Sequence, residues 1–450
     1  MEKNFLFKHG PIRLSKNRKY LEHADGTPFF WLADTWWYGM TSRLPVPLFR
    51  KLAKFRAKQG FTVIQIVVGI PPEIDAKNAK KIGGNPFKDD LSLDKVYFEE
   101  VDKKIKYLVD NGLVPVIFGG WGHHIDVLGL NNVKKLWHEI VARYSSYPVI
   151  FCLAGEIDIV SPSVILNSVK NLLRFFGRVR RGSQNDNVGK RIKKWTEIGD
   201  YISSIDPFKR PITAHVSRKT TAHDLLGDKK WLSINSIQSG HSKDSVSFMI
   251  NSIKKSVAFK MPIINMEPWY EGILGNFGEY EQRFAFWACI LSGAKGHSYG
   301  AHGIWQMSKD NENFMKHWGE SNWEEALKFK GAKQLGLSRK FLEKYEWWKF
   351  KPDFDRVSPH WTKDNYYLPI SAKIENRHLF IYVPRVGGVR EIRVKSLIAK
   401  SFYKVSYVSP ESMRVIDRFK FGGNESIIPI PRSKTKDLLL VMTTSQESKV

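Results

Sequence analysis

The chain has 450 residues, enough for a large buried core and longer than most single domains. Its 71 Lys and Arg residues outnumber its 45 Asp and Glu residues, and the formal net charge of +26 would favour acidic partners such as nucleic acid, anionic lipid or an anionic glycan, although a Lys-rich solvated surface is the expected explanation. The two cysteines, Cys152 and Cys289, lie in apolar stretches and predict buried thiols, which excludes a disulfide framework.

The N-terminal segment and the distribution of apolar residues indicate the expected compartment of the protein. The first twenty residues place charges among a few apolar side chains, which does not fit a signal peptide. No stretch reaches the roughly 18 apolar residues of a membrane helix. We therefore expect a soluble, cytoplasmic protein with no membrane partner. A dense basic run at residues 175–195 falls in a predicted loop, but no zinc-finger, RNA-recognition or helix-turn-helix motif accompanies it, so we do not expect a nucleic-acid partner.

A short β lead-in with a turn at Asp25-Gly26 precedes a repeated pattern of apolar runs and helical segments. Continuous apolar runs are typical of parallel strands that are buried on both faces. The amphipathic segments between them include two that should end at Gly60 and Gly112, because glycine commonly terminates helices. The predicted strands are FFWLAD, FTVIQIVV, LVPVIFGG, VIFCLAGE, RPITAHV, WLSINSIQ, PIINME and AKGHSYG.

Eight such strands alternating with helices predict an α/β fold, a (β/α)8 TIM barrel over residues 1–350, completed by a helical stretch at residues 322–345. The long excursion between Asp158 and Pro211 and the short gap between His215 and Trp231 would also fit an irregular barrel or another α/β sheet. Beyond this region, apolar and polar residues alternate between turn clusters. That pattern predicts an antiparallel β-sandwich domain over residues 351–450.

The ends of the predicted strands carry chemically useful side chains, and a TIM barrel collects its active-site groups at these ends. Glu156 follows the fourth strand and Glu267 ends the seventh, so the two carboxylates should face each other across the barrel mouth. Glycoside hydrolysis uses such a pair, and aromatic rings bind the faces of sugars. The expected substrate-binding residues are Asp34, Trp36, Trp37, Trp121, His123, His215, Gln238, Tyr270, Tyr299 and Trp305.

The apolar strand before Glu156 should raise the pKa of this carboxyl, as suits a general acid. Asp158 could be the general acid instead, but we expect it to have a structural role such as capping a helix. The alternative for either glutamate is an ion pair with a Lys or Arg residue on the rim. The adjacent His123 and His124 would face opposite ways on a strand, and the first strand lacks the spaced histidine pair of barrel metallohydrolases. We expect no metal and no other cofactor.

Five segments, LEHADGTPFFWLADTWW, RAKQGFTVIQ, FCLAGEIDI, INMEPWYEG and GAKGHSYGAHGIW, resemble the apiosidase-like glycoside hydrolases in sequence and in order. The resemblance implies a TIM barrel, often followed by a small β domain that carries a collagen-binding label. It further implies retaining hydrolysis of an oligosaccharide or glycoside, with Glu156 as acid/base and Glu267 as nucleophile. Asp34, Thr35 and Trp36 would line the subsite for the non-reducing sugar.

This sequence departs from the family pattern at the fourth strand. Glu156 stands where members often have Asp, and the Asn-Glu pair common in the wider clan is absent, since Gly155 precedes Glu156. Substrates vary across the family, so the resemblance does not identify the sugar. Two other interpretations stay open: a non-catalytic carbohydrate-binding protein on the same barrel, and a basic protein associated with nucleic acid.

Overall fold

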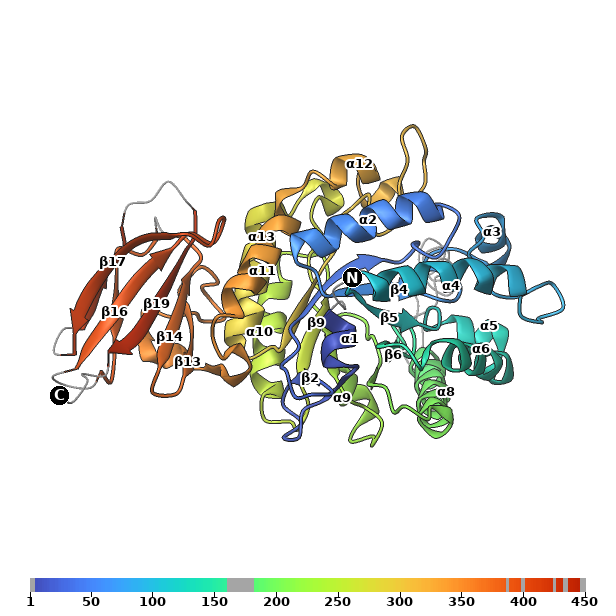
Figure 1. Ribbon diagram of the computed structural model, residues 1–450, viewed down its shortest axis with the longest axis horizontal. Coiled ribbons are helices and arrows are strands. Elements are labelled where there is room, and N and C mark those ends of the chain that lie inside the picture. Colours follow the sequence, from blue (N-terminus) through green and yellow to red (C-terminus); the bar gives the residue numbers. More distant parts are fainter. Residues whose placement is uncertain are drawn as a thin grey trace.

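The computed structural model describes residues 5–159, 182–385, 388–397, 401–423, 426–431 and 436–445. A barrel with surrounding helices occupies most of the molecule, and the C-terminal strands form a separate layer at one end (Figure 1). None of the helices in these ranges is long and apolar enough to cross a membrane.

Eight parallel strands form the central sheet, in the order β7-β6-β5-β4-β3-β10-β9-β8, and they coincide with the eight predicted apolar runs. Nearly every residue in them is buried, because the sheet is covered by helices outside and filled by side chains inside. The strands are β3 (Trp31–Trp36), β4 (Val63–Val67), β5 (Val114–Phe118), β6 (Ile150–Cys152), β7 (Ile212–Thr213), β8 (Asn235–Gln238), β9 (Ile263–Glu267) and β10 (Gly296–Tyr299).

The sheet closes on itself between its two outer strands, β7 and β8. A parallel bridge joins Ile212 to Leu232, and the backbone N–H of Ser233 donates a hydrogen bond to the Ile212 carbonyl at 2.8 Å. The Thr213 hydroxyl donates to the carbonyl of Ile234, also at 2.8 Å. The predicted TIM barrel is therefore confirmed, and the short gap before Trp231 holds only the small helix α9.

The helices that surround the barrel follow the predicted amphipathic segments. Helix α2 ends at Gln59 because Gly60 adopts φ = 101°, a left-handed conformation that favours glycine. The stretch predicted at residues 322–345 forms two helices, α12 and α13. The described helices are α1 (Phe5–His9), α2 (Val46–Gln59), α3 (Ala76–Lys81), α4 (Lys95–Asp110), α5 (His124–Leu128), α6 (Leu130–Tyr144), α8 (Gly182–Ile205), α9 (Ala222–Leu226), α10 (Ser245–Ser256), α11 (Glu279–Ser292), α12 (Trp323–Ala326) and α13 (Lys330–Leu342).

The basic run predicted as a loop at residues 175–195 is corrected where the structure describes it. Its first part, residues 175–181, lies outside the described residues, but the remainder belongs to α8. Trp195, Ile198 and Ile202 recur at helical spacing and are buried, so packing against the barrel holds this segment as a helix despite its lysines. The antiparallel hairpin of β1 (Ile12–Leu14) and β2 (Leu21–His23) forms the predicted β lead-in.

The C-terminal region contains two antiparallel sheets. The larger has the order β11-β13-β14-β19-β16-β17 and the smaller β12-β15-β18. Apolar residues of both sheets, such as Ile381 and Leu440 in the larger and Ile392 and Ile428 in the smaller, share one core. The strands are β11 (Lys351–Pro352), β12 (Val357–Ser358), β13 (Ile370–Ile374), β14 (His378–Val383), β15 (Glu391–Val394), β16 (Phe402–Val408), β17 (Val415–Gly422), β18 (Ile427–Pro429) and β19 (Leu438–Ser445).

The opposite face of the larger sheet packs against helix α11 of the barrel. Tyr382 alternates with the inward-facing Ile381, and its ring stacks on Trp287 with centroids 6.2 Å apart. Arg283 of α11 donates two hydrogen bonds to the fully buried Asp437, at 2.9 and 2.8 Å. Apolar packing and a bidentate ion pair thus join the β region to the outside of the barrel, away from the ends of strands β3 to β10.

Candidate active site

A cavity of about 280 Å³ lies where the barrel strands end. Glu156 and Glu267 both line it, together with most of the rings and polar side chains that the sequence indicated. The predicted residues found in its wall are Trp37, Trp121, His123, Glu156, Gln238, Glu267, Tyr270 and Trp305. The barrel therefore brings two carboxylates, from segments more than a hundred residues apart, into one cavity.

Glu267, the last residue of β9, is held by donors from neighbouring segments. Its Oε1 accepts hydrogen bonds from Gln238 Nε2 at 2.8 Å and from His241 Nε2 at 3.2 Å. Its Oε2 lies 3.4 Å from Nε2 of the buried His215. Burial opposes ionisation, but the donors from His215 and His241 outweigh it and hold the pKa of Glu267 below its usual range. Glu267 is therefore a carboxylate at neutral pH.

His215 connects the two glutamates through its two ring nitrogens. Its Nδ1 accepts a hydrogen bond from the backbone N–H of Glu156 at 3.2 Å, so in the neutral ring the proton sits on Nε2. That proton faces Oε2 of Glu267. His215 does not line the cavity, so the structure replaces the predicted contact with substrate by contacts with the two glutamates.

Glu156 sits just beyond β6 in an unusual backbone conformation, with φ = 45°. A non-glycine residue in this left-handed region carries strain of the kind found at functional sites. The preceding Gly155 makes room for Trp121, since a Cβ at position 155 would lie only 2.3 Å from the Trp121 ring. Trp121 then donates a hydrogen bond from Nε1 to Glu156 Oε2 at 3.0 Å. The backbone geometry and this indole together aim the carboxyl into the cavity.

The electrostatic environment of Glu156 is opposite to that of Glu267. Burial and, second, the negative charge of Glu267 raise the pKa of Glu156, and although His215 and the hydrogen bonds from Trp121 and Gln238 oppose the increase, the pKa reaches about 7. A protonated Glu156 therefore coexists with an ionised Glu267 near neutral pH. The raised pKa agrees with the expectation from the apolar strand that precedes Glu156.

The walls of the cavity combine flat rings with unsatisfied polar atoms. The rings of Trp37 and Trp121 meet edge to face, with centroids 5.4 Å apart. Three buried atoms in the wall, Trp305 Nε1, Gln238 Oε1 and His123 Nδ1, have no hydrogen-bond partner within the described part of the chain. Buried polar groups in proteins are almost always paired, so these atoms are suited to bind a ligand rich in hydroxyl groups.

Asp34, Trp36 and Tyr299 were expected to bind substrate, and the structure corrects this prediction. All three are fully buried and none lines the cavity. Asp34 Oδ2 instead accepts hydrogen bonds from Arg56 Nε at 2.6 Å and from Trp36 Nε1 at 2.7 Å. The Tyr299 hydroxyl donates to Glu271 at 2.7 Å. These residues form a polar cluster outside the barrel strands.

The alternation of side chains along a strand explains the correction. In β3, Asp34 and Trp36 point outward to helix α2. Thr35 points inward and accepts a hydrogen bond from Gln65. In β10, the inward residue is Ser298, which also contacts Gln65. Strand ends alone do not determine which of two neighbouring residues faces the barrel axis.

The Asp34–Arg56 contact yields a stability prediction. Asp34→Asn should lower the free energy of unfolding by about 3–5 kcal/mol, because it leaves the guanidinium of Arg56 buried without its carboxylate. KM should stay close to the wild-type value, since Asp34 does not line the cavity. Urea unfolding measures the first effect and steady-state kinetics the second. Asp89→Asn, which removes an exposed contact to Lys80, is the matched control and should change little. A raised KM with unchanged stability would contradict the correction.

Six cavity residues were not among the predicted site residues, and three of them carry polar or aromatic side chains: His241, Glu73 and Trp318. His241 follows Gln238 at the end of β8, a position that strand-end reasoning could have included. Glu73 accepts hydrogen bonds from Trp318 Nε1 at 2.9 Å and from His317 Nε2 at 3.0 Å, and so joins the loop after β4 to the segment after β10. No sequence pattern indicated this contact, because its two sides are over 240 residues apart.

Asp158, for which the sequence predicted a structural role, makes contacts of that kind. Its two oxygens accept hydrogen bonds from the backbone N–H and the hydroxyl of Ser217, at 2.7 and 2.6 Å. Asp158 therefore ties the loop after β6 to the loop after β7. It does not line the cavity.

Solved structures share this architecture. A glycoside hydrolase family 5 structure from Bacteroides vulgatus ATCC 8482 aligns with a TM-score of 0.78 at 20% identity and covers 100% of this chain and 96% of its own. A structure described as a glycoside hydrolase aligns with a TM-score of 0.76 at 21% identity over 100% of both chains. A family 5 mannosidase from Rhizomucor miehei aligns less well, with a TM-score of 0.52 at 11% identity over 75% of this chain and 99% of its own. These similarities show a common fold.

The family of the chain follows from a sequence match over its barrel. Comparison with curated protein sequences finds no match. Residues 15–349, which span the barrel from the N-terminal hairpin to the end of its last helices, match the model of the apiosidase-like catalytic domain. The protein is thus a member of the apiosidase-like family and a glycoside hydrolase.

Proposed function

We propose that the protein hydrolyses a glycosidic bond with retention of anomeric configuration, with Glu267 as the nucleophile and Glu156 as the acid/base. The observation that supports this most directly is the opposite displacement of two carboxyl pKa values in one cavity, downward at Glu267 and upward to about 7 at Glu156. A retaining glycosidase needs one ionised and one protonated carboxyl group at the start of the reaction. A protein that only binds carbohydrate has no need for such a difference.

The hydrogen bonds to the two glutamates indicate which carboxyl oxygen of each takes part in the first step. Oε1 of Glu267 accepts from Gln238 and His241, so the less engaged Oε2 attacks the anomeric carbon. Oε2 of Glu156 accepts from Trp121, so Oε1 carries the proton that passes to the leaving oxygen. The glycosidic bond breaks as the ester bond to Glu267 forms.

The second step reverses the role of Glu156. Once Glu267 is an ester it bears no negative charge, and the repulsion that raised the pKa of Glu156 disappears. Glu156, deprotonated in the first step, therefore stays ionised at neutral pH and takes a proton from water as the water attacks the anomeric carbon. Glu267 leaves as a carboxylate that His215, His241 and Gln238 stabilise through the contacts already present.

The size of the cavity bears on the substrate. At about 280 Å³ it falls at the small end of ligand pockets, and the Glu73–Trp318 contact bounds its rim. These features favour a short glycoside or the end of a chain over a polymer that runs through an open groove. The rings of Trp37, Trp121 and Tyr270 would contact the apolar faces of the sugar.

Product stereochemistry tests the proposed mechanism. A panel of aryl glycosides identifies a cleaved substrate, and proton NMR during the first minutes of hydrolysis then shows the anomer released before mutarotation. We expect the same anomeric configuration as in the substrate. Release of the opposite anomer would show an inverting enzyme, in which Glu267 activates water and forms no ester.

The pKa of Glu156 also predicts the pH profile. The free enzyme must carry a proton on Glu156, so kcat/KM should fall as pH rises above about 7. Trp121→Phe removes a hydrogen bond that stabilises the ionised carboxyl, which raises the pKa of Glu156 and moves this decline to higher pH. Trp37→Phe, which also alters a ring in the cavity wall, is the control and should leave the position of the decline unchanged. A shift to lower pH in Trp121→Phe, or equal shifts in both variants, would contradict the assignment of Glu156.

A further inference from the structure

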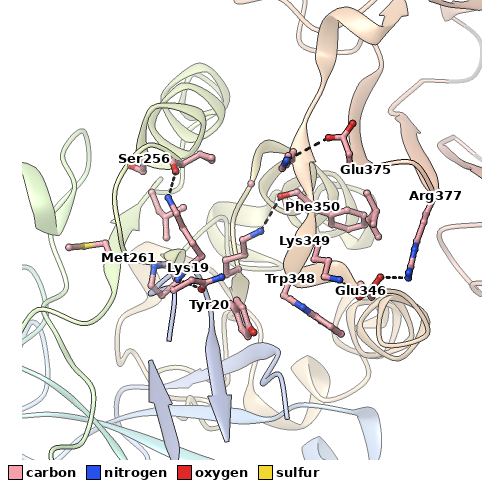
Figure 2. A pocket seen from close by; sticks show the side chains of 18 residues that line it. Lys19, Tyr20, Ser256, Met261, Glu346, Trp348, Lys349, Phe350, Glu375 and Arg377 are labelled. Atoms are coloured by element: carbon pink, nitrogen blue, oxygen red, sulfur yellow. Dashed lines mark hydrogen bonds and ion pairs between the residues drawn. The ribbon is translucent and has the colours of Figure 1, made fainter. Parts of the chain in front are cut away.

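A second cavity, of about 710 Å³, lies at the other end of the barrel (Figure 2). Ile263, the first residue of β9, lines it, whereas Glu267, the last residue of the same strand, lines the active-site cavity. A strand rises about 3.3 Å per residue, so the two cavities are separated by the thickness of the barrel. The larger cavity is therefore a separate feature, bounded by the barrel bottom, the N-terminal hairpin loop and the first residues of the β region.

Positive side chains outnumber negative ones in the lining of this second cavity. Its cations are Lys19, Lys295, Lys349, Lys351 and Arg377, and its carboxylates are Glu346 and Glu375. Both carboxylates are already engaged. Glu346 contacts Lys349 and, at 2.5 Å, Arg377, and Glu375 lies 3.6 Å from Lys351.

The two remaining cations, Lys19 and Lys295, lack a negative partner. Neither has a carboxylate within 4.0 Å in the described ranges, and backbone carbonyls hold their amines in place. Lys19 Nζ donates to the carbonyls of Val257 and Phe259 at 3.0 and 2.9 Å, and Lys295 Nζ donates to that of Phe350 at 3.2 Å. An ammonium group has three N–H donors, so both amines keep at least one for another acceptor.

Lys295 is unusual because it is only 9% exposed. Burial and, second, the nearby positive charge of Lys19 lower its pKa to about 8. Two neighbouring positive side chains are thus fixed beside one cavity. An anion between them would offset their mutual repulsion and satisfy the free N–H groups.

Aromatic side chains stand next to these amines. The half-buried Trp348 lines the cavity beside Tyr20, with ring centroids 6.2 Å apart and planes tilted by 41°. Figure 2 shows both rings, with Lys19 close to Tyr20, on the walls of the same cavity. A flat or sugar-like ring could therefore lie on Trp348 while an attached acidic group reaches the lysines.

We propose that this cavity binds a small acidic ligand that contains a ring, with its carboxylate or phosphate held by Lys19 and Lys295 and its ring against Trp348. The inference stands independently of the hydrolytic mechanism, because none of these residues lines the active-site cavity. It supplies a specific role for part of the chain's large positive charge.

Isothermal titration calorimetry of the full chain tests the proposal with glucuronate, glucose 6-phosphate and adenosine monophosphate as probes, and with neutral glucose as the reference. We expect saturable binding of at least one acid and at least about tenfold weaker binding of glucose. Lys295→Met and Lys19→Met should each weaken binding of that acid by about tenfold or more, and Trp348→Ala should weaken it as well. The probe that binds identifies whether the oxyanion is a sugar carboxylate, a sugar phosphate or a nucleotide phosphate.

The matched control is Lys54→Met, which removes an exposed lysine of α2 that does not line the cavity and should leave affinity unchanged. Thermal melts establish that the variants are folded, and the partly exposed Lys19 provides a second test should Lys295→Met prove unstable. Glycoside hydrolysis should be unaffected in all of these variants. The proposal is overturned by an absence of saturable binding for every acid, by equal affinity for glucose, or by unchanged affinity in Lys19→Met.

Discussion

Glu267→Gln should lower kcat by at least about 10⁴-fold on any glycoside that the wild-type enzyme cleaves. The amide cannot form the ester with the anomeric carbon, yet it has the same shape as the carboxylate. Its oxygen can still accept the hydrogen bonds that Gln238 and His241 donate to Oε1 of Glu267, so the fold should be unaffected. Steady-state kinetics together with circular dichroism and a thermal melt measure both expectations.

Glu271→Gln is the matched control for this variant. Glu271 belongs to the same segment after β9, but it is buried away from the cavity and accepts hydrogen bonds from the Tyr299 hydroxyl and the Gly331 N–H. Burial raises the pKa of Glu271, and although these hydrogen bonds oppose the increase, the pKa reaches about 7. An amide therefore imitates its protonated form, and activity should stay close to wild type. Full activity in Glu267→Gln, or an equal loss in both variants, would remove Glu267 from the mechanism.

Glu156→Ala should lower kcat/KM by about 10²–10⁴-fold on substrates whose leaving group needs a proton. On dinitrophenyl glycosides, whose leaving group needs none, formation of the ester should continue and its hydrolysis should become limiting. Added azide should then restore turnover, because this anion attacks the ester without a base and fits the space that the missing carboxyl leaves beside Trp121. Kinetics with and without azide, and NMR of the glycosyl azide formed, provide the measurement.

Asp158→Ala distinguishes the loss of an acid/base at Glu156 from general damage to the loop after β6. Asp158 lies two residues beyond Glu156 and contacts Ser217, not the cavity. Its loss should affect stability more than chemistry, and azide should not raise its turnover. The assignment of Glu156 fails if azide leaves Glu156→Ala inactive or accelerates both variants equally.

The barrel itself could be predicted because each of its strands is a local pattern. Continuous apolar runs, separated by amphipathic helices that end at residues such as Gly60, predicted eight buried parallel strands in the order in which they occur. The pair Glu156 and Glu267 could be predicted for the same reason. Residues at the ends of strands in a closed barrel meet at one mouth, whatever their separation in sequence.

The contacts that give this pair its chemistry were not readable from the sequence. The hydrogen bond from Trp121 to Glu156, the double contact of His215 and the donors from Gln238 and His241 depend on which side chains meet across the barrel. These contacts fix the direction of each pKa shift. The roles proposed for the two carboxyls therefore rest on tertiary neighbours.

Periodicity and strand ends are local properties, so the strands, their order along the chain and the two carboxylates at the barrel mouth could be predicted from the sequence. The folded chain was needed to place Asp34 and Tyr299 away from the cavity and to bring Glu73 and Trp318 together at the rim. Which of two neighbouring side chains at the end of a strand points into the barrel depends on how the strand is oriented there. Loop contacts depend on segments that are distant in the sequence. Side-chain direction and loop contacts can therefore be read from the folded chain but not from a local sequence pattern.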